Sequence, residues 1–593
     1  MAANLTPQQH EAVTFDGHLL IVAGPGSGKT STSVAKAKRI LNDPARSLVM
    51  VTFTKEAAEE MRKRLATALT KAGAKIPNEE RLIVATFHSI AIQHLSRHRP
   101  RFKVLSPAAQ SMLFRDALMA AHVEKDKRAD VQKDFERFMY AVDRNAGVSS
   151  PECQQVVERY MRLVQDSGQV DLYTVMRDCA LQVDAGTIPP LPHTDILVDE
   201  GQDTDDLQRL WIFAHARAGR RVTIVGDDDQ SVYEWRNALG YEGMRSFLET
   251  FNARRIELGD NFRSRSEILD PAAKLIACNK KRLGKNLVAR RGPGGAITAF
   301  RASSSEDQNF SLADVIEAAA ESHRNGAVLA RTNLSLDMLE IVLRGRGLPY
   351  LRLGRSIWHQ PVIAGYVGLL QSILDGTPAG LLPVLQLRKV SDDARADLLT
   401  QLRGNASTFL DGEVPVLDSA DASDTAVLKA LAKDCSYWRK QLRGTRLGGS
   451  VREVILEVGE QYARWNKGGT KKSLLELCSK ILADLNGTLS ARLRVISRKD
   501  RDLSKAPIVL MTMHGAKGLE FETVHIVDAN HDDDGIDALK PEAERRLMYV
   551  AMTRAKNCCV TWYFGEPHPT LAEAQIPTAR TKADLVALIS AAR

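Results

Sequence analysis

The feature that most constrains the fold of this chain is the segment GPGSGKT at residues 24–30, which directly follows the apolar run LLIVA. The residues after it, STSVAKAKRIL, have the apolar spacing of a helix with one buried side. Strand, glycine-rich turn and helix in this order match the P-loop template, in which backbone N–H groups and the positive end of the helix face phosphate oxygens. The segment therefore predicts a nucleoside-triphosphate site at the edge of a parallel α/β sheet.

Each residue type in this loop has a chemical use. The backbone of three glycines would approach the phosphates, namely Gly24, Gly26 and Gly28. Lys29 would neutralise charge on the β- and γ-phosphates as a catalytic group, and Thr30 would offer its hydroxyl to Mg²⁺. The loop alone does not complete a hydrolytic site, because the metal needs a carboxylate and the attacking water needs a base.

Two later strands end in polar residues that could supply these groups. The segment DILVDE ends in Asp199, a candidate Mg²⁺ ligand, and Glu200, a candidate base for the attacking water. An isolated Asp-Glu pair is more often a solvated strand end, but this strand is apolar up to the pair. The strand before GDDDQ leads to Gln230, whose amide could contact a γ-phosphate or the water. Together these segments predict nucleotide hydrolysis.

An aromatic pair follows Gln230. Tyr233 and Trp235 stand two residues apart beside Arg236, an arrangement suited to stacking on unpaired bases. The same spacing is common at strand edges and in protein cores, and the residues alone leave both readings open.

The order of apolar strands and helical stretches predicts two α/β cores, each interrupted by a mainly helical insert. The expected segments are 1–92 (first core, with the P-loop), 93–187 (first insert), 188–265 (first core, second part), 266–375 (second core, first part), 376–497 (second insert) and 498–593 (second core, last part).

Composition narrows the class of protein. The chain has 593 residues, of which 44% are hydrophobic and 26% charged, so a disordered, collagen-like or membrane-spanning chain is excluded. Its seven cysteines include no C-x-x-C pair and predict neither a disulfide framework nor a zinc or iron–sulfur site. The N-terminus has no secretory signal pattern. We expect a cytoplasmic protein, and the net charge of +8 is compatible with a polyanion partner.

A series of ordered segments resembles the motifs of the UvrD/Rep/PcrA-type superfamily 1 DNA helicases. They are LTPQQHEAV (5–13), TFTKEAAEEM (52–61), ATFHSIA (85–91), DEGQD (199–203), GDDDQSVYEWR (226–236), LGDNFRSRSEIL (258–269), MTMHGAKGLEF (511–521) and ERRLMYVAMTRAK (544–556). The resemblance implies two RecA-like P-loop NTPase cores, ATP and Mg²⁺ as cofactors, and 3′-to-5′ movement on single-stranded DNA. It also implies a nucleoid-associated helicase of DNA repair, replication or recombination that acts at junctions of single- and double-stranded DNA.

The resemblance also implies roles for individual residues. Gln9 and Phe262 would contact adenine and Glu520 the ribose, and Arg263 and Arg554 would be arginine fingers that reach the γ-phosphate from outside the P-loop unit. The residues along the DNA would be Phe53, Thr86, His88, Tyr233, Trp235, Arg236, Thr512 and His514.

The sequence departs from the family at several positions. Glu234 stands where a basic residue is usual and is expected to weaken attraction to a phosphate backbone. The second insert lacks the family's Gly-Ile-Gly duplex-contacting element, which puts unaided unwinding in doubt. Asp532, Asp533 and Asp534 suggest a metal site, although an acidic solvated loop is the favoured reading.

The sequence leaves two other functions open. The compact second insert and the end of the chain at Arg593 motivate an alternative, a DNA-sensing ATPase subunit that regulates a partner nuclease in a repair or anti-phage complex. An RNA helicase is less favoured, since the motifs resemble the DNA branch. The expected partners are DNA and a nuclease or repair factor, and the chain is expected to be a monomer or weak dimer with no membrane association.

Overall fold

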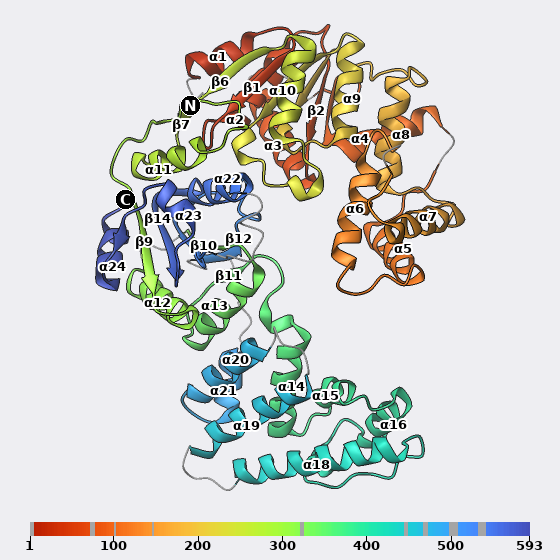
Figure 1. Ribbon diagram of the computed structural model, residues 1–593, viewed down its shortest axis with the longest axis vertical. Coiled ribbons are helices and arrows are strands. Elements are labelled where there is room, and N and C mark those ends of the chain that lie inside the picture. The colour runs from red at the N-terminus through yellow and green to blue at the C-terminus, as the bar shows by residue number, and fades with distance from the viewer. Residues whose placement is uncertain are drawn as a thin grey trace. The chain divides into compact units, whose positions relative to one another are not determined.

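The computed structural model forms two compact units (Figure 1). Unit 1 comprises Met1–Pro293 and Ile536–Thr553, and unit 2 comprises Gly294–Gly535 and Arg554–Arg593. Both are built on parallel sheets flanked by helices, which confirms the predicted α/β class. The structure describes residues 5–71, 77–99, 102–144, 147–320, 325–443, 449–466, 472–496, 508–531 and 541–592.

The sheet of unit 1 has six strands in the order β3-β2-β4-β5-β1-β6, and all its neighbours are parallel. Side chains alternate along a strand, so in β1 Leu20 and Val22 join the core on one face while Leu19 and Ile21 join the core on the other. Burial on both faces explains why this segment is continuously apolar. The strands are β1 (Leu19–Ala23), β2 (Leu48–Thr52), β3 (Leu82–Thr86), β4 (Asp195–Val198), β5 (Arg221–Gly226) and β6 (Arg254–Leu258), beside a small separate pair, β7 (Asp260–Asn261) and β8 (Val288–Ala289).

Helices cover both faces of this sheet. One face packs against α1, α2 and α3, and the other against α4, α8, α9 and α10. The helices of unit 1 are α1 (Pro7–Thr14), α2 (Lys29–Asn42), α3 (Lys55–Thr70), α4 (Phe87–His98), α5 (Pro107–Ala120), α6 (Arg128–Tyr140), α7 (Pro151–Asp166), α8 (Leu172–Asp184), α9 (Asp206–Arg217), α10 (Gly240–Phe251), α11 (Ser266–Ala277) and α22 (Pro541–Met552), with short 3₁₀ turns η1 (Gly201–Asp203), η2 (Asp228–Gln230) and η3 (Glu234–Arg236).

The helical segment between β3 and β4 has a core of its own. Side chains of α5, α6 and α7 form a cluster distinct from those on the sheet. Phe135 is at its centre, with its ring 5.0 Å from that of Tyr160 and 4.7 Å from that of Phe114. This segment therefore stabilises itself by its own packing.

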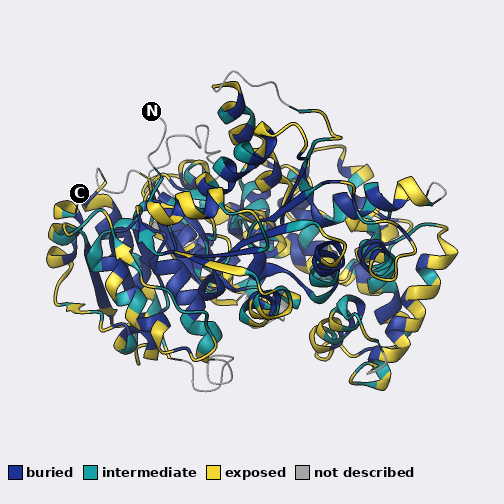
Figure 2. Ribbon diagram, turned by 90° about the horizontal axis from the view of Figure 1, so that it is seen from above, coloured by how far each residue is buried: buried dark blue, intermediate teal, exposed yellow. Residues whose placement is uncertain are grey.

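The sheet of unit 2 has seven strands in the order β11-β12-β10-β13-β14-β9-β15, again with parallel neighbours. In the ribbon of Figure 2 the central strands are dark blue, and much of the exposed, yellow ribbon belongs to helices. The strands are β9 (Ala296–Ala302), β10 (Gly326–Ala330), β11 (Leu351–Arg352), β12 (Ile508–Thr512), β13 (Phe521–Ile526), β14 (Ala555–Phe564) and β15 (Thr578–Ala579).

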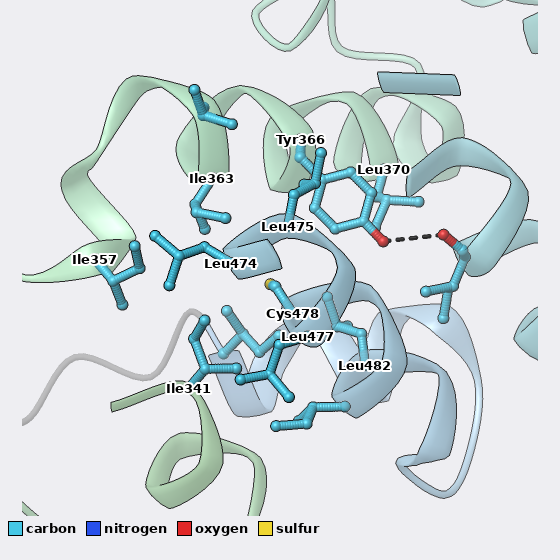
Figure 3. Close-up of a cluster of buried hydrophobic side chains, with 14 of the residues drawn as sticks. Ile341, Ile357, Ile363, Tyr366, Leu370, Leu474, Leu475, Leu477, Cys478 and Leu482 are labelled. Carbon is cyan, nitrogen blue, oxygen red and sulfur yellow. Dashed lines mark hydrogen bonds between the residues drawn. The ribbon is translucent and has the colours of Figure 1, made fainter. Parts of the chain in front are cut away.

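The helical insert of unit 2 shares one continuous core with the sheet. Figure 3 shows Ile341 of α13, Tyr366 of α14 and Leu474 of α20 in this cluster, with the Tyr366 hydroxyl donating to the carbonyl of Ile455 at 3.0 Å. The helices of unit 2 are α12 (Ser305–Ala318), α13 (Asn333–Gly345), α14 (Pro361–Asp375), α15 (Leu381–Leu387), α16 (Asp392–Leu402), α17 (Ser407–Leu410), α18 (Ala422–Arg443), α19 (Gly449–Trp465), α20 (Lys472–Asp484), α21 (Leu489–Ile496), α23 (Pro569–Glu573) and α24 (Lys582–Ala591), with the 3₁₀ turn η4 (Ile357–His359).

The six segments expected from the sequence stay a prediction, but the compact units group two pieces differently. Residues 266–293 and 536–553, both expected in the second core, belong to unit 1. Within the described ranges no helix is long and apolar enough to cross a membrane. Asp532, Asp533 and Asp534 lie outside the described residues.

Candidate nucleotide and DNA site

The P-loop connects the carboxyl end of β1 to the first turn of α2. Gly26 and Gly28 have φ angles of +61° and +78°, in the left-handed region that glycine adopts without strain. Gly28 is the N-cap of α2 and provides no side-chain cap, so the positive end of this helix is left to a ligand. The loop is braced internally, because the Ser27 hydroxyl donates to the carbonyl of Gly24 at 2.8 Å.

Close packing explains why the loop is rich in glycine. A Cβ added to Gly26 would lie 2.6 Å from Cβ of Arg263, and one added to Gly24 would lie 2.6 Å from Cδ2 of Leu287. At Gly28 the added atom would lie 2.7 Å from Nε2 of Gln9. The three predicted glycines therefore lie in a tight backbone cradle of the kind that phosphates occupy.

The carboxylate loop after β4 approaches the P-loop. Oε2 of Glu200 lies 3.9 Å from Nζ of Lys29. Glu200 has φ +51°, which is uncommon for a non-glycine residue and directs its side chain away from the ordinary strand path. The N–H of Asp199 donates to the carbonyl of Val51 at 2.9 Å, which fixes the start of this loop to β2. The structure thus brings together the two segments that the sequence predicts for hydrolysis.

A chain of amides connects this loop to the one after β5. Gln202 donates through Nε2 to Glu200 at 2.5 Å, and its Oε1 accepts the N–H of Asp227 at 2.9 Å. Gln230 donates through Nε2 to Oδ2 of Asp227 at 2.5 Å. Gln202 and Asp227 are fully buried, so their part of the network is shielded from water.

The donor set suits Mg²⁺. Thr30 would offer a hydroxyl from the first turn of α2, and Asp199 would offer a carboxylate directly after β4. The neighbouring residues Lys29 and Glu200 approach each other, which brings these two segments together. Magnesium prefers oxygen ligands of this kind and retains several waters.

The segment Asn261–Phe262–Arg263 packs directly on the P-loop. Asn261 donates through Nδ2 to the carbonyl of Pro25 at 2.6 Å, and the N–H of Phe262 donates to the carbonyl of Gly26 at 2.9 Å. Phe262 is 48% exposed, so part of this residue is accessible to a ligand.

Arg263 lies near the end of the segment expected as the second part of the first core, and it belongs to unit 1 with its backbone beside Gly26. The physical reason is that Oδ1 of Asn261 accepts the N–H of Arg263 at 2.9 Å, which fixes its backbone beside Gly26. Its Nη1 donates to the carbonyl of Thr553, also in unit 1, at 3.2 Å. Its role as an arginine finger stays a prediction.

Gln9 braces the P-loop from α1. Its Nε2 donates to the carbonyl of Ser27 at 2.9 Å, and its Oε1 accepts the N–H of Thr6 at 3.0 Å. A cavity of about 500 Å³ opens beside it, lined also by Gly259, Asn286 and others of unit 1. The adenine contact expected of Gln9 would use the remaining hydrogen-bonding capacity of its amide.

Three of the expected DNA residues lie at or just after the carboxyl ends of β2 and β3. Phe53 is half-buried, with its ring 5.9 Å from that of Phe87. Thr86 is the N-cap of α4 and its hydroxyl accepts the N–H of Ser89 at 3.3 Å, so it has a structural role besides any contact with DNA. Burial lowers the pKa of His88, which favours the neutral imidazole at neutral pH.

The segment after Gln230 presents the expected stacking residues. Tyr233 is half-buried and lies 5.7 Å from the guanidinium of the exposed Arg236. The side chain of Trp235 is outside the described parts of the structure.

Glu234 does not behave as its sequence position suggests. Its carboxylate accepts from Arg546 of α22 at 2.5 Å, and both residues belong to unit 1. The expected weakening of attraction to phosphate is therefore offset, because the negative charge of Glu234 is paired.

The remaining expected residues lie in unit 2. The Thr512 hydroxyl accepts the N–H of Gly515 at 3.2 Å, and burial lowers the pKa of His514. Glu520 forms an ion pair with Lys556 at 3.1 Å. Arg554 is 1% exposed and donates through Nη1 to the carbonyl of Leu519 at 3.3 Å.

Sequence reasoning missed several residues of this region. Lys285 lies fully buried against Asp227, Asp228 and Asp229, and Arg282 forms an ion pair with Asp229 at 2.7 Å. The three adjacent carboxylates after an apolar strand were a signal for a buried cation, because buried charges need partners.

The chain is similar to known proteins over most of its length. Residues 5–252 match the UvrD/REP helicase N-terminal domain, and residues 256–358 and 451–563 match the UvrD-like helicase C-terminal domain. The chain is 29% identical to DNA helicase II of Escherichia coli (strain K12), over 93% of this chain and 83% of the relative.

Other similar proteins carry the name ATP-dependent DNA helicase PcrA. One from Leuconostoc citreum is 27% identical over 92% of this chain and 80% of its own length. One from Bacillus subtilis (strain 168) is 26% identical over 94% of this chain and 82% of its own length.

Proposed function

The chain belongs to the UvrD/REP helicase family, and from that premise we propose that it moves 3′ to 5′ along single-stranded DNA and separates duplex strands ahead of it. It is an ATP-hydrolysing DNA helicase, and its two parallel sheets are the RecA-like cores of the family. The process it serves would be DNA repair, replication or recombination. The protein would act in the cytoplasm, in association with the nucleoid. There it would act at junctions of single- and double-stranded DNA.

One observation carries the proposal for ATP hydrolysis. The P-loop lysine and the carboxylate that follows β4 come from segments far apart in sequence, yet Lys29 Nζ and Glu200 Oε2 lie 3.9 Å apart. A cation for the phosphates and a base for water at this spacing fit around a γ-phosphate. The pair also lies beside the N-terminus of α2, where no side chain caps the helix. This position favours a phosphate site over an ordinary surface ion pair.

The residues would divide the reaction as follows. Lys29 binds the β- and γ-phosphates, and Glu200 accepts the proton of the attacking water. Gln230 orients that water or the γ-phosphate through its amide oxygen. Bound Mg²⁺, held by Thr30 and Asp199, would neutralise phosphate charge.

Other groups would hold the nucleotide and sense its state. Phe262 would stack on adenine, Gln9 would read its edge and Glu520 would accept a ribose hydroxyl. Arg263, beside the P-loop, and Arg554, in unit 2, would stabilise charge on the γ-phosphate as arginine fingers. Closure around ATP and release after hydrolysis would then drive stepping.

The DNA contacts would combine stacking with phosphate binding. Aromatic rings such as Phe53, Tyr233 and Trp235 tolerate any base sequence because every base has a π-face. Thr86, His88, Arg236, Thr512 and His514 would contact phosphates or bases along the strand.

The alternative function, a DNA-sensing ATPase that regulates a nuclease, is not favoured. The similarity to proteins named as DNA helicases extends over more than nine-tenths of the chain. A protein partner and a monomeric or weakly dimeric state stay predictions.

The test is an unwinding assay on 3′-tailed and 5′-tailed duplexes beside a single-strand translocation assay. We expect ATP-dependent separation of the 3′-tailed duplex and movement toward the 5′ end. Separation of the 5′-tailed duplex alone would contradict the polarity. DNA-stimulated ATP hydrolysis without translocation would support the ATPase-subunit alternative.

A further inference from the structure

Lys285 is a fully buried ammonium group in unit 1, and its side chain has no exposed surface. Its Nζ lies 2.7 Å from Oδ1 of Asp227, 3.5 Å from Oδ1 of Asp228 and 2.5 Å from Oδ2 of Asp229. Lys285 lies in the loop between α11 and β8. It lies outside the segments that resemble helicase motifs.

The burial of this group needs an explanation. Removing an ammonium from water costs several kcal/mol unless opposite charges surround it. The three carboxylates supply that compensation and hold the pKa of Lys285 above its usual value despite burial. Arg282 neutralises Asp229 from the side, at 2.7 Å, and does not contact Asp227 in the described contacts.

The two oxygens of Asp227 have different partners. Oδ1 faces Lys285, and Oδ2 accepts the amide of Gln230 at 2.5 Å. With one oxygen held by a fixed cation, the carboxylate cannot rotate without losing an ion pair. The position of this carboxylate in turn fixes the orientation of the Gln230 amide. Only the amide nitrogen, Nε2, can donate to a carboxylate, so the amide oxygen points away from it.

Asp227 is also connected to the carboxylate loop that follows β4. Its N–H donates to Gln202, which donates to Glu200, the carboxylate nearest Lys29. Because the bond to Gln202 is made by the backbone N–H, a change in the orientation of the Asp227 carboxylate acts on Gln230 and leaves the contact to Gln202 in place.

We propose that Lys285 is a positioning residue for ATP hydrolysis, which acts through Asp227 to hold Gln230 with its amide oxygen directed to the water or γ-phosphate. The inference rests on the proposed role of Gln230. Lys285 itself touches neither nucleotide nor water in this role.

The main test is a charge-balanced double variant, Lys285→Met with Asp228→Asn, which removes one positive and one negative charge from the cluster. We expect kcat of DNA-stimulated ATP hydrolysis to fall roughly 10- to 10²-fold, as for a small misplacement of a reacting group. KM and the Kd of a non-hydrolysable ATP analogue should stay within about twofold, because phosphate binding is left to the P-loop.

A matched control is Arg282→Met with Asp228→Asn, which makes the same change in charge without removing a contact to Asp227. We expect its kcat to stay close to that of the unmodified chain. An equal loss of kcat in both double variants would mean that the cluster only supports the fold, and would overturn the proposal.

The coupling to Gln230 is tested by repeating the Lys285→Met, Asp228→Asn change in a Gln230→Ala chain. We expect no further loss there, since residues that act through one another are not additive. A loss that multiplies with that of Gln230→Ala would overturn the proposal.

Should the Lys285 variant fail to fold, Asp227→Asn carries the same test, because it removes the carboxylate through which Lys285 acts. Its loss of kcat should likewise vanish in the Gln230→Ala chain, and an additive loss would overturn the proposal. The unmodified chain and Lys29→Ala are measured alongside. An unmodified chain that hydrolyses no ATP would refute the proposed function, whereas normal hydrolysis by the Lys285 variant refutes only this inference.

Discussion

The segment from β1 to α2 in unit 1 and the segment from β9 to α12 in unit 2 share the order of parallel strand, short loop and helix, but they differ at the N-terminus of the helix. In unit 1, β1 leads through left-handed glycines to α2, whose N-cap Gly28 provides no side chain. In unit 2, β9 leads to α12, whose N-cap Ser304 accepts the N–H of Asp307 at 3.1 Å. The carboxylate of Asp307 also accepts the N–H of Ser303 at 2.8 Å.

The difference shows what decides a nucleotide site on this fold. In unit 2 an acidic side chain occupies the positive end of the helix, where it stabilises the helix and repels phosphate. The hydrogen bonds from Ser303 hold the pKa of Asp307 below its usual value, so the charge persists at neutral pH. We therefore expect the loop sequence, and not the sheet, to decide that the phosphates of ATP bind in unit 1.

The largest expected effect comes from Lys29→Ala, which should lower ATP hydrolysis by roughly 10²- to 10³-fold because a preorganised cation for the γ-phosphate is lost. DNA binding should persist and remain sensitive to salt. The control is Lys582→Ala, which removes an exposed lysine paired with Asp314 in unit 2. Retained DNA-stimulated hydrolysis in Lys29→Ala would contradict the assignment of the P-loop.

Tyr233→Ala should weaken single-stranded DNA affinity by about 1–3 kcal/mol, the usual value of one base stacked on an aromatic ring. Fluorescence anisotropy with a labelled oligonucleotide measures this, while the Kd of an ATP analogue should not change. The matched control in unit 2 is Tyr437→Ala, since Tyr437 is 50% exposed on α18. If the Tyr233 variant and the unmodified chain bind single-stranded DNA with equal affinity, Tyr233 does not stack on a base and only packs against the protein.

Gly26→Ala should weaken binding of an ATP analogue by about 1–2 kcal/mol, because an L-residue in the left-handed region is strained. The new Cβ would also press on Arg263. Gly347→Ala is the control, since Gly347 of unit 2 has φ +70° and open space around its Cβ position. If both variants bind the analogue equally well, the close packing of the loop is not needed for phosphate binding.

The smallest effect concerns pH. Burial raises the pKa of Asp205 in unit 1 to about 7, whereas in unit 2 burial raises the pKa of Asp337 only to about 6, partly because Arg352 lies nearby. A carboxyl with a raised pKa binds its proton more tightly in the folded state. Stability therefore falls as pH rises from the unfolded pKa toward the folded one.

Between pH 6 and 7 this loss should reach up to about 1 kcal/mol for Asp205. Asp205→Asn should reduce the slope, because an amide retains the helix cap and does not titrate. Denaturant unfolding at several pH values measures it. An unchanged slope would show that Asp205 is not the titrating group.

Much of unit 1 could be predicted from local sequence. A continuous apolar strand followed by GPGSGKT determines the cradle, and the carboxylates at the end of β4 had to meet it, since parallel strands end at one edge of the sheet. The close approach of Arg263 to Gly26 could not be predicted, because a hydrogen bond from the N–H of Arg263 to Oδ1 of Asn261, and not a sequence pattern, fixes it.

Long-range ion pairs could not be predicted at all. Arg546 and Glu234 are 312 residues apart, and Lys285 lies 58 residues after Asp227 in a loop without periodicity. Such pairs form only when the tertiary fold brings distant helices and loops together, and no local sequence pattern indicates this. The role of Thr86 as a helix cap was hidden by its place in a motif that suggests DNA contact.

The most direct test of the central claim is the number of nucleotides bound per chain, measured by calorimetric titration with a non-hydrolysable ATP analogue and Mg²⁺. The open helix end of unit 1 and the capped end in unit 2 predict one nucleotide per chain, lost in Lys29→Ala and retained in Lys582→Ala. Two nucleotides per chain, or one that survives Lys29→Ala, would contradict the assignment of ATP to unit 1.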